Sequence, residues 1–254
     1  MAGGTSTPGE SVLSRSMRLL SAFDADDPYL TLAELSARGG LPLSTTHRLA
    51  RELTNLGLLD HGRDGRYRIG VRLWEIGGLA PISLELREQA MPLLMRLYDA
   101  TGENAHLAVL DGHEALYLIR IMGPHAVPTL SRMGGRHPLH TTGVGKALLM
   151  TRDEHWLDRF LAQPLERDTT HSITDPAELR AELNRARVRG YATTREEMTL
   201  GNVSIAAPLP AVPGLPPAAI GVVTHLDRAD ENRLAPLVIK AATAVSEVFA
   251  SARS

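Results

Sequence analysis

The side chains best suited to chemistry or ligand binding are concentrated between residues 137 and 146, in the run HPLHTTGVGK. His137 and His140 lie three residues apart and could bind a metal such as zinc, but no third ligand lies nearby. The turn TTGVG that follows precedes a predicted helix, so it offers hydroxyls and backbone N–H groups to an anion. We therefore expect an anion-binding turn at residues 141–145 and no metal.

Lys146 invites a second interpretation, that of a phosphate-binding loop. The preceding residues lack the spacing G-x-x-x-x-G-K followed by Ser or Thr, so we expect no nucleotide and no cofactor.

No G-x-S-x-G turn accompanies the histidines, which gives a serine hydrolase little support. The absence of cysteine excludes thiol catalysis and disulfides. His106 is expected to pack in the core or to line a pocket. We expect no catalysis; the alternative is an enzyme that acts on a small acid.

The composition indicates a globular protein with one locally basic segment. The 254 residues are 43% hydrophobic and 22% charged, and the formal net charge is −2. From Ser44 to Arg72, however, six arginines face only three acidic residues. Such local basicity favours a nucleic-acid-binding face on an otherwise neutral protein. We find no apolar run of about eighteen residues and no apolar signal segment, so we expect a cytoplasmic protein without a membrane partner.

Residues 31–56 have the pattern of two helices joined by a tight turn. Thr31 and Glu34 have the T-x-x-E spacing of a capping box, and Gly39-Gly40 predicts the end of that first helix. A second helix is predicted to begin at Ser44 as N-cap, with Leu49, Leu53 and Leu56 on its inner face. Helix, glycine turn and helix form the helix-turn-helix plan, in which the second helix enters the DNA major groove.

Two short strand-like runs, residues 58–61 and 66–69, follow this pair and flank Asp64-Gly65, a two-residue hairpin signal. Three arginines in the hairpin could track the phosphate backbone, as the wing of a winged helix-turn-helix does. The alternative is a helical pair and hairpin whose charges are merely solvated. The DNA-contacting residues would be Ser44, Thr45, His47, Arg48 and Arg51 in the second helix, with Arg63 and Arg66 in the wing.

The remaining pattern predicts an α+β protein with two domains, residues 1–80 and 81–254. Strands in antiparallel meanders, with helices gathered at intervals, distinguish the second domain from a doubly wound fold. Glu196 and Glu197 could pair with arginines of another subunit or remain solvated. The other expected helices are Val12–Ala25, Val71–Leu79, Leu84–Thr101 with a break at Pro92, one from about Gly145, two starting at Thr151 and Asp175, and Asp230–Ala252; the expected strands are Asn104–Leu110, Ala115–Ile121, Ala126–Leu130, Tyr191–Thr194, Val203–Leu209 and Ala218–His225.

Over nearly its whole length the chain resembles the IclR family of bacterial transcriptional regulators. The matching motifs are LSRSMRLLSAF, the helix-turn-helix run, RYRIGVRLWEIG, HPLH running into TTGVGKALL, and GYATTREEMTLGNVSIAAPL. The resemblance implies a winged helix-turn-helix followed by an effector-binding domain similar to a GAF or PAS fold. It also implies a homodimer or homotetramer that binds double-stranded operator DNA.

The resemblance also implies an effector pocket. The chain departs from the family's common serine-rich S-x-S-G stretch at residues 220–224, IGVVT, which makes that wall less polar. We therefore expect a small organic acid, aromatic rather than a two- or three-carbon acid, as effector of a repressor. The pocket positions, together with a threonine of the anion-binding turn, fall on His137, Thr142, Gly143, Val144, Thr194, Asn202, Ser204, Gly221 and Val223.

Overall fold

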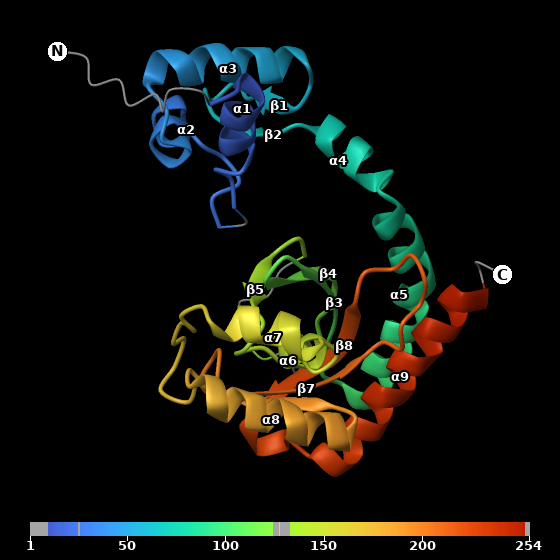
Figure 1. Ribbon diagram of the computed structural model, residues 1–254. Helices are drawn as coiled ribbons and strands as arrows, with labels where there is room; N and C mark the ends of the chain where they lie inside the picture. Colours follow the sequence, from blue (N-terminus) through green and yellow to red (C-terminus); the bar gives the residue numbers. More distant parts are fainter. Residues whose placement is uncertain (1–9, 25, 124–126, 128–132, 252–254) are drawn as a thin grey trace. The chain divides into compact units, whose positions relative to one another are not determined.

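The computed structural model describes residues 10–24, 26–123, 127 and 133–251. The chain divides into two compact units, Met1–Ala80 and Pro81–Ser254, which are coloured blue to teal and teal to red in Figure 1. Six elements form the first unit: α1 (Val12–Leu20), α2 (Leu32–Gly39), α3 (Leu43–Asn55), β1 (Leu59–His61), β2 (Tyr67–Ile69) and α4 (Val71–Gly78).

The predicted helix-turn-helix is confirmed in the first unit. The backbone N–H of Glu34 donates to the Thr31 hydroxyl at 3.3 Å, and the Thr31 N–H donates to the Glu34 carboxylate at 2.7 Å, which completes the capping box. Gly40 ends α2 with a φ of 59°, a left-handed conformation that favours glycine. Arg18 of α1 donates to the Gly40 carbonyl at 2.8 Å, so α1 is tied to the turn between the two helices.

Three local predictions for this unit are wrong. The N-cap of α3 is Pro42, not Ser44, and no side chain caps the helix. Leu56 lies just beyond α3 and is 56% exposed, whereas Leu49 and Leu53 are buried. The first helix ends at Leu20, short of Ala25, which lies outside the described residues.

The wing hairpin is confirmed, but its turn is longer than predicted. Register pairs His61 with Tyr67, so the loop is residues 62–66 rather than Asp64-Gly65 alone. The Gly62 N–H donates to the Arg66 carbonyl, and the Asp64 carboxylate accepts from the Arg66 N–H at 3.2 Å. These bonds stabilise the wider loop, which sequence spacing alone did not indicate.

The second unit is built on an antiparallel six-stranded sheet in the order β5-β4-β3-β8-β7-β6. This confirms the α+β class. The strands are β3 (Asn104–Asp111), β4 (Glu114–Ile121), β5 (Arg136–Pro138), β6 (Ala192–Arg195), β7 (Asn202–Pro208) and β8 (Ala218–His225); the helices are α5 (Pro81–Thr101), α6 (Gly143–Leu149), α7 (Glu154–Leu161), α8 (Pro176–Arg189), the short 3-10 turn η1 (Leu226–Arg228) and α9 (Glu231–Ser251).

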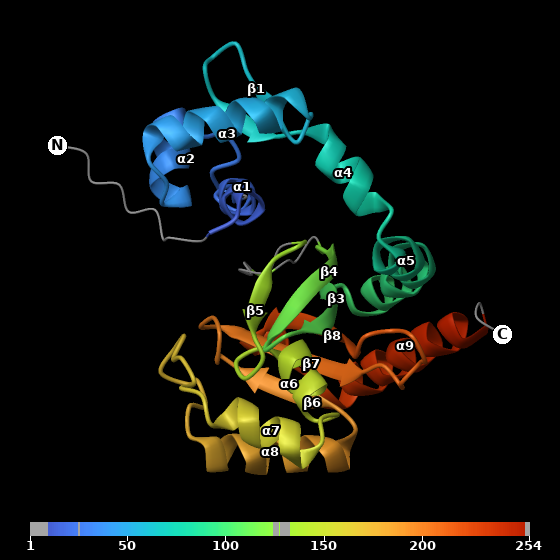
Figure 2. The same ribbon diagram turned by 45° about the horizontal axis from the view of Figure 1, so that its top comes forward.

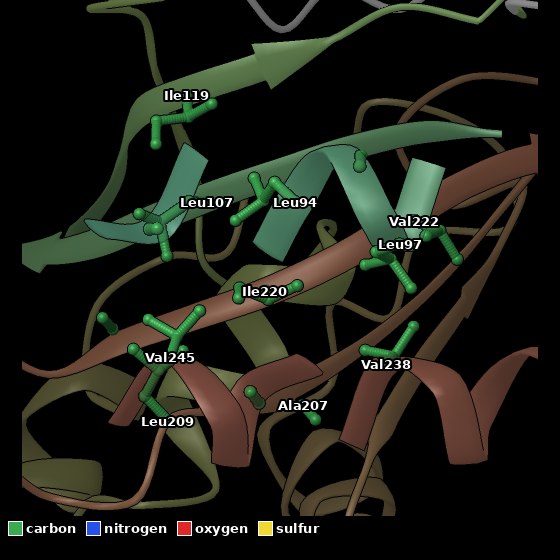
Figure 3. Packing of buried hydrophobic residues seen from close by; sticks show 14 of the residues in the cluster. Leu94, Leu97, Leu107, Ile119, Ala207, Leu209, Ile220, Val222, Val238 and Val245 are labelled. Carbon is green, nitrogen blue, oxygen red and sulfur yellow. The ribbon is translucent and has the colours of Figure 1, made fainter. Parts of the chain in front are cut away.

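The two faces of this sheet carry different layers (Figure 2). Helices α5 and α9 cover one face, where large aliphatic side chains from α5, the sheet and α9 interdigitate (Figure 3). Helices α6, α7 and α8 cover the other face, on which the strands present small residues such as Ala108, Ala206 and Ala219. Along β8, Ile220 and Val222 point to the first face and Ala219 to the second, as the two-residue period of a strand requires.

A β-bulge in β4 interrupts this alternation. Leu107 of β3 pairs with Ile119 and Ala108 pairs with Tyr117, so Leu118 is an extra residue between two paired positions. Because of that extra residue, Ile119 packs with the α5/α9 face while Tyr117 packs on the α6 face. The bulge therefore places an aromatic ring beneath α6.

Several other predictions for this unit need correction. Helix α5 runs through Pro92 without a break, and Leu94 and Leu97 beyond it are buried in the core. Helix α6 begins at Gly143 because Thr142 caps it, and α7 is capped by Asp153 rather than Thr151. Strand β5 (residues 136–138) was not predicted, and the predicted strand Ala126–Leu130 lies outside the described residues except for Val127. The cap at Asp175 is confirmed.

Helix α9 is, among the described residues, the one helix long and apolar enough to cross a membrane by length and composition. Its Leu234, Val238, Val245 and Phe249 are buried against the sheet in the core of the second unit. The core helix of a globular protein can have the same length and apolar composition, so the packing of α9 in the core explains why it is apolar.

Candidate ligand pocket and nucleic-acid interface

A pocket lies between the α6 face of the sheet and the segments that follow β5 and β6. Its empty space amounts to about 420 Å³, part of which is open to solvent. Of the nine predicted positions, six line this pocket: Thr142, Gly143, Thr194, Asn202, Ser204 and Val223. The remaining lining residues are His106, Tyr117, Thr141, Glu197, Met198 and Thr199.

Three predicted positions, His137, Val144 and Gly221, are not among the lining residues. The His137 ring packs edge-on against Tyr117, with ring centroids 5.1 Å apart. Val144 is 2% exposed, and a Cβ placed on Gly221 would approach Val144 Cγ1 at 3.1 Å. Val144 and Gly221 therefore bring α6 close to β8, which is a packing role.

Gly143 permits a second close approach, between α6 and β7. A Cβ at this position would lie 2.3 Å from the Ser204 hydroxyl oxygen and 2.8 Å from Ser204 Cβ. No larger residue fits there unless α6 moves away from the sheet. Gly143 thus sets the pocket's width, and substituting it would disturb the fold as well as the pocket.

The threonines of the predicted anion-binding turn use their hydroxyls within the protein. Thr142 Oγ1 donates to the Pro138 carbonyl at 2.8 Å and accepts from the Gly145 N–H at 3.2 Å. Thr141 Oγ1 donates to the Asp168 carboxylate at 2.6 Å. Both threonines line the pocket, but these contacts fix the turn instead of leaving two hydroxyls for a ligand.

Two buried aromatic side chains, His106 and Tyr117, line the β3–β4 end of the pocket. Their ring centroids are 5.4 Å apart with an interplanar angle of 71°, an edge-to-face contact. Burial, with the positive charge of Arg120 acting in the same direction, lowers the pKa of His106 to about 3. Burial also raises the pKa of the Tyr117 hydroxyl. Both rings are therefore neutral near pH 7. Sequence reasoning left His106 open and missed Tyr117, because the bulge that turns Tyr117 inward has no local signal.

A buried ion pair joins two walls of the pocket. Lys146 Nζ of α6 lies 2.6 Å from Glu197 Oε1 in the segment between β6 and β7, and their side chains are 1% and 8% exposed. Burial raises the pKa of the Glu197 carboxyl, and the positive charge of Lys146 opposes that rise. The suggestion that Glu197 pairs with another subunit or stays solvated is therefore wrong. Glu196 instead accepts from the Gly201 N–H at 2.8 Å.

The loop after α7 holds Glu197 in place through its backbone. The hydroxyl of Ser172 donates to the Glu197 carbonyl at 2.7 Å, and Thr169 Oγ1 donates to the Glu196 carbonyl at 2.6 Å. His140 Nε2, one of the two histidines considered as metal ligands, lies 2.7 Å from the Glu166 carbonyl in the same loop. Among the described residues, no group of three or more His, Cys, Asp or Glu side chains is arranged to hold a metal.

The first unit presents a continuous polar surface on α3. Ser44, His47, Arg48 and Arg51 are exposed, Thr45 is half-buried, and Thr46 and Leu49 face the core. Arg63 and Arg66 are exposed in the wing loop, while Arg68 pairs with Asp60 at 3.3 Å. The two exposed arginine groups lie on the elements that a winged helix-turn-helix applies to the groove and to phosphate.

Comparisons with known proteins find relatives of both units of the chain. Residues 12–62 match the model of the IclR helix-turn-helix domain, and residues 80–247 match that of the bacterial transcriptional regulator IclR C-terminal domain. The chain is 34% identical over 249 residues to the HTH-type transcriptional regulator BhcR of Paracoccus denitrificans, covering 96% of this chain and 89% of that protein. It is 31% identical over 248 residues to the transcriptional repressor IclR of Escherichia coli K12, covering 95% and 90%.

A solved structure is also similar. It is an IclR homologue from Microbacterium hydrocarbonoxydans in complex with 4-hydroxybenzoate, with a TM-score of 0.89 and 32% identity, covering 95% of this chain and 100% of that one.

The buried ion pair generates a stability prediction. Replacing Lys146 by methionine should destabilise the second unit by about 3–5 kcal/mol, because the Glu197 carboxylate would be buried without a counter-charge. Adding Glu197→Gln in the same chain should recover much of that loss. Urea denaturation of the full chain, followed by circular dichroism, measures both. Equal stability of wild type and Lys146→Met would show that the pair carries no such role.

Proposed function

The chain belongs to the IclR family of bacterial transcriptional regulators, and we propose that it is a cytoplasmic repressor whose operator binding is controlled by a small aromatic acid. Members of this family regulate transcription and are not enzymes. In this proposal residues 1–80 bind DNA, and residues 81–254 bind the effector and form the oligomer. Effector binding changes the spacing of paired DNA-binding units, on which affinity for two operator half-sites depends.

The observation that carries the aromatic preference is the neutral ring pair His106 and Tyr117 at one end of the pocket. Val223 and Met198 add apolar lining, while Thr194, Asn202 and Ser204 supply polar groups that can orient a ligand. The similar protein solved with 4-hydroxybenzoate supports the same ligand class. His137, Val144 and Gly221 support the pocket from behind in this scheme.

The exposed face of α3 supplies the proposed base-reading contacts. The exposed residues on this face are Ser44, His47, Arg48 and Arg51. Thr45, near the start of the helix, is half-buried. In the described part of the chain, no carboxylate pairs with Arg48, Arg63 or Arg66, so these cations are available to DNA. We assign Arg48 to a base edge in the major groove and the two wing arginines to phosphates.

Exposed apolar side chains on α1 and α4 support a homodimer or tetramer. Exposed apolar patches of this kind on a soluble protein mark contact surfaces. A second copy of the chain, related by a two-fold axis, would bury the same residues on both copies. The residues are Val12, Leu13 and Met17 on α1, Val71, Trp74 and Ile76 on α4, and Leu79 directly after α4, each 51–78% exposed.

A substitution in the pocket tests effector control. Substituted benzoates should raise the melting temperature, since a ligand at 100 times its dissociation constant stabilises a protein by about 2.7 kcal/mol. The variant Val223→Phe should fill the pocket and abolish that shift and the effector response, while operator affinity stays unchanged. Val188→Phe adds the same bulk at a position that is 91% exposed and serves as control. A Val223→Phe protein that responds normally would place the effector elsewhere.

Substitutions on α3 and in the wing separate base reading from phosphate contact. Arg48→Ala should cost about 1–3 kcal/mol in operator binding and relax specificity at one base pair. Arg63→Ala should instead weaken specific and non-specific DNA alike and reduce the salt slope by about one unit. Fluorescence anisotropy across a salt series measures both effects. Undiminished operator affinity in folded Arg48→Ala would refute its assignment.

The oligomer is tested in solution. Multi-angle light scattering at micromolar concentration should give a dimer or tetramer mass, and Trp74→Asp should lower operator affinity because the two-fold contact is lost. Glu75→Gln, on the same helix, should leave both mass and affinity unchanged. A monomeric wild type that still binds operator tightly contradicts the proposal.

A further inference from the structure

The pocket lacks an available positive charge among its lining residues. Among the described lining residues, Glu197 is the only charged side chain, and Lys146 already neutralises it at 2.6 Å. His106 is neutral near pH 7 because burial lowers its pKa to about 3. A carboxylate that leaves water for such a site loses its hydration, which is costly unless a counter-charge lies close by.

Arg120 on β4 supplies a positive charge beside the His106 end of the pocket. Register pairs Arg120 with His106 of β3, and side chains of directly opposite residues share one face of a sheet. Because the bulge at Leu118 puts Ile119 on the α5/α9 face, Arg120 falls on the pocket face with His106. The charge of Arg120 reaches His106, since it lowers the pKa of that imidazole.

The guanidinium of Arg120 is half-buried and uncompensated in the described part of the chain. Its Nε atom is buried without a hydrogen-bond partner, and no described carboxylate pairs with the side chain. Two other cations near the pocket are occupied: Lys146 by Glu197, and Arg136 by Asp111 and Glu114. A half-buried, unpaired arginine is costly by itself, so an anion at this place would stabilise it.

We propose that Arg120 is the counter-ion for the carboxylate of the effector, and that it makes the pocket select an acid over the corresponding amide. This inference rests on the proposed function and deepens it, because a charge at Arg120 would fix the orientation of the effector in the pocket. The carboxylate lies toward Arg120 and His106, and the ring lies against Tyr117 and Val223. Any substituent at the opposite end of the ring then faces the polar side chains of β6 and β7, Thr194 and Asn202.

Acid and amide pairs give a direct test. We would measure by calorimetry the affinities of benzoate, 4-hydroxybenzoate, benzamide and 4-hydroxybenzamide for the full-length wild type and for Arg120→Gln. Loss of a charge-assisted contact should weaken the acids by about tenfold or more, while the affinities of the amides stay unchanged. Arg120→Lys keeps the charge and should retain part of the preference for acids. Arg136→Gln removes one positive charge from the adjacent strand β5 and should change neither class.

The possible results separate this inference from the proposed function. Equal binding of acids by wild type and folded Arg120→Gln overturns the inference and leaves the proposed function standing. An equal loss of acids and amides also overturns it, since Arg120 would then support the pocket's shape and not its charge preference. A wild type that binds none of the acids overturns the proposed function, and the inference with it.

Discussion

The buried ion pair between Lys146 and Glu197 is the contact on which the pocket depends. It links α6, which packs over the sheet, to the segment between β6 and β7, and these two elements form opposite walls of the same space. Burying two charges is costly, so the pair persists only because their separation is short and the surrounding backbone is fixed. Thr169 and Ser172 provide that fixation through the carbonyls of residues 196 and 197. The loop after α7 does not line the pocket, but its hydrogen bonds hold one of the pocket's walls in place.

The sheet performs two tasks on its two faces. On the α5/α9 face, large aliphatic residues pack into a core that stabilises the unit. On the α6 face, alanines and Gly221 allow one helix to approach closely, and beyond that close contact the helix and the strands leave a space unfilled. The bulge at Leu118 then closes one end of that space with the Tyr117 ring. The pocket therefore results from small strand residues where α6 contacts the sheet and from the large Tyr117 ring at one end of the space.

Features encoded by neighbouring residues were predictable from the sequence. The capping box at Thr31 and Glu34 and the cap at Asp175 each depend on side chains within four positions. Ser44 and Thr151 failed as caps because spacing identifies several candidate caps, and packing selects one of them. Tyr117, Arg120 and the Lys146–Glu197 pair were missed because a bulge or a contact across 51 residues positions them. The family resemblance supplied five lining positions, Gly143, Thr194, Asn202, Ser204 and Val223, and the anion-binding turn supplied Thr142.

In the proposed function, the binding of effector in the pocket and of DNA on the first unit are linked by one coupling free energy, which reciprocal titration measures most directly. The operator dissociation constant of the full chain is measured with and without saturating aromatic acid, and the acid's dissociation constant with and without saturating operator. Thermodynamic linkage requires both ratios to be equal, and typical allosteric coupling makes each about 5–150-fold. Equal ratios in that range are the predicted result. An acid that binds tightly while both ratios remain at unity would contradict the account.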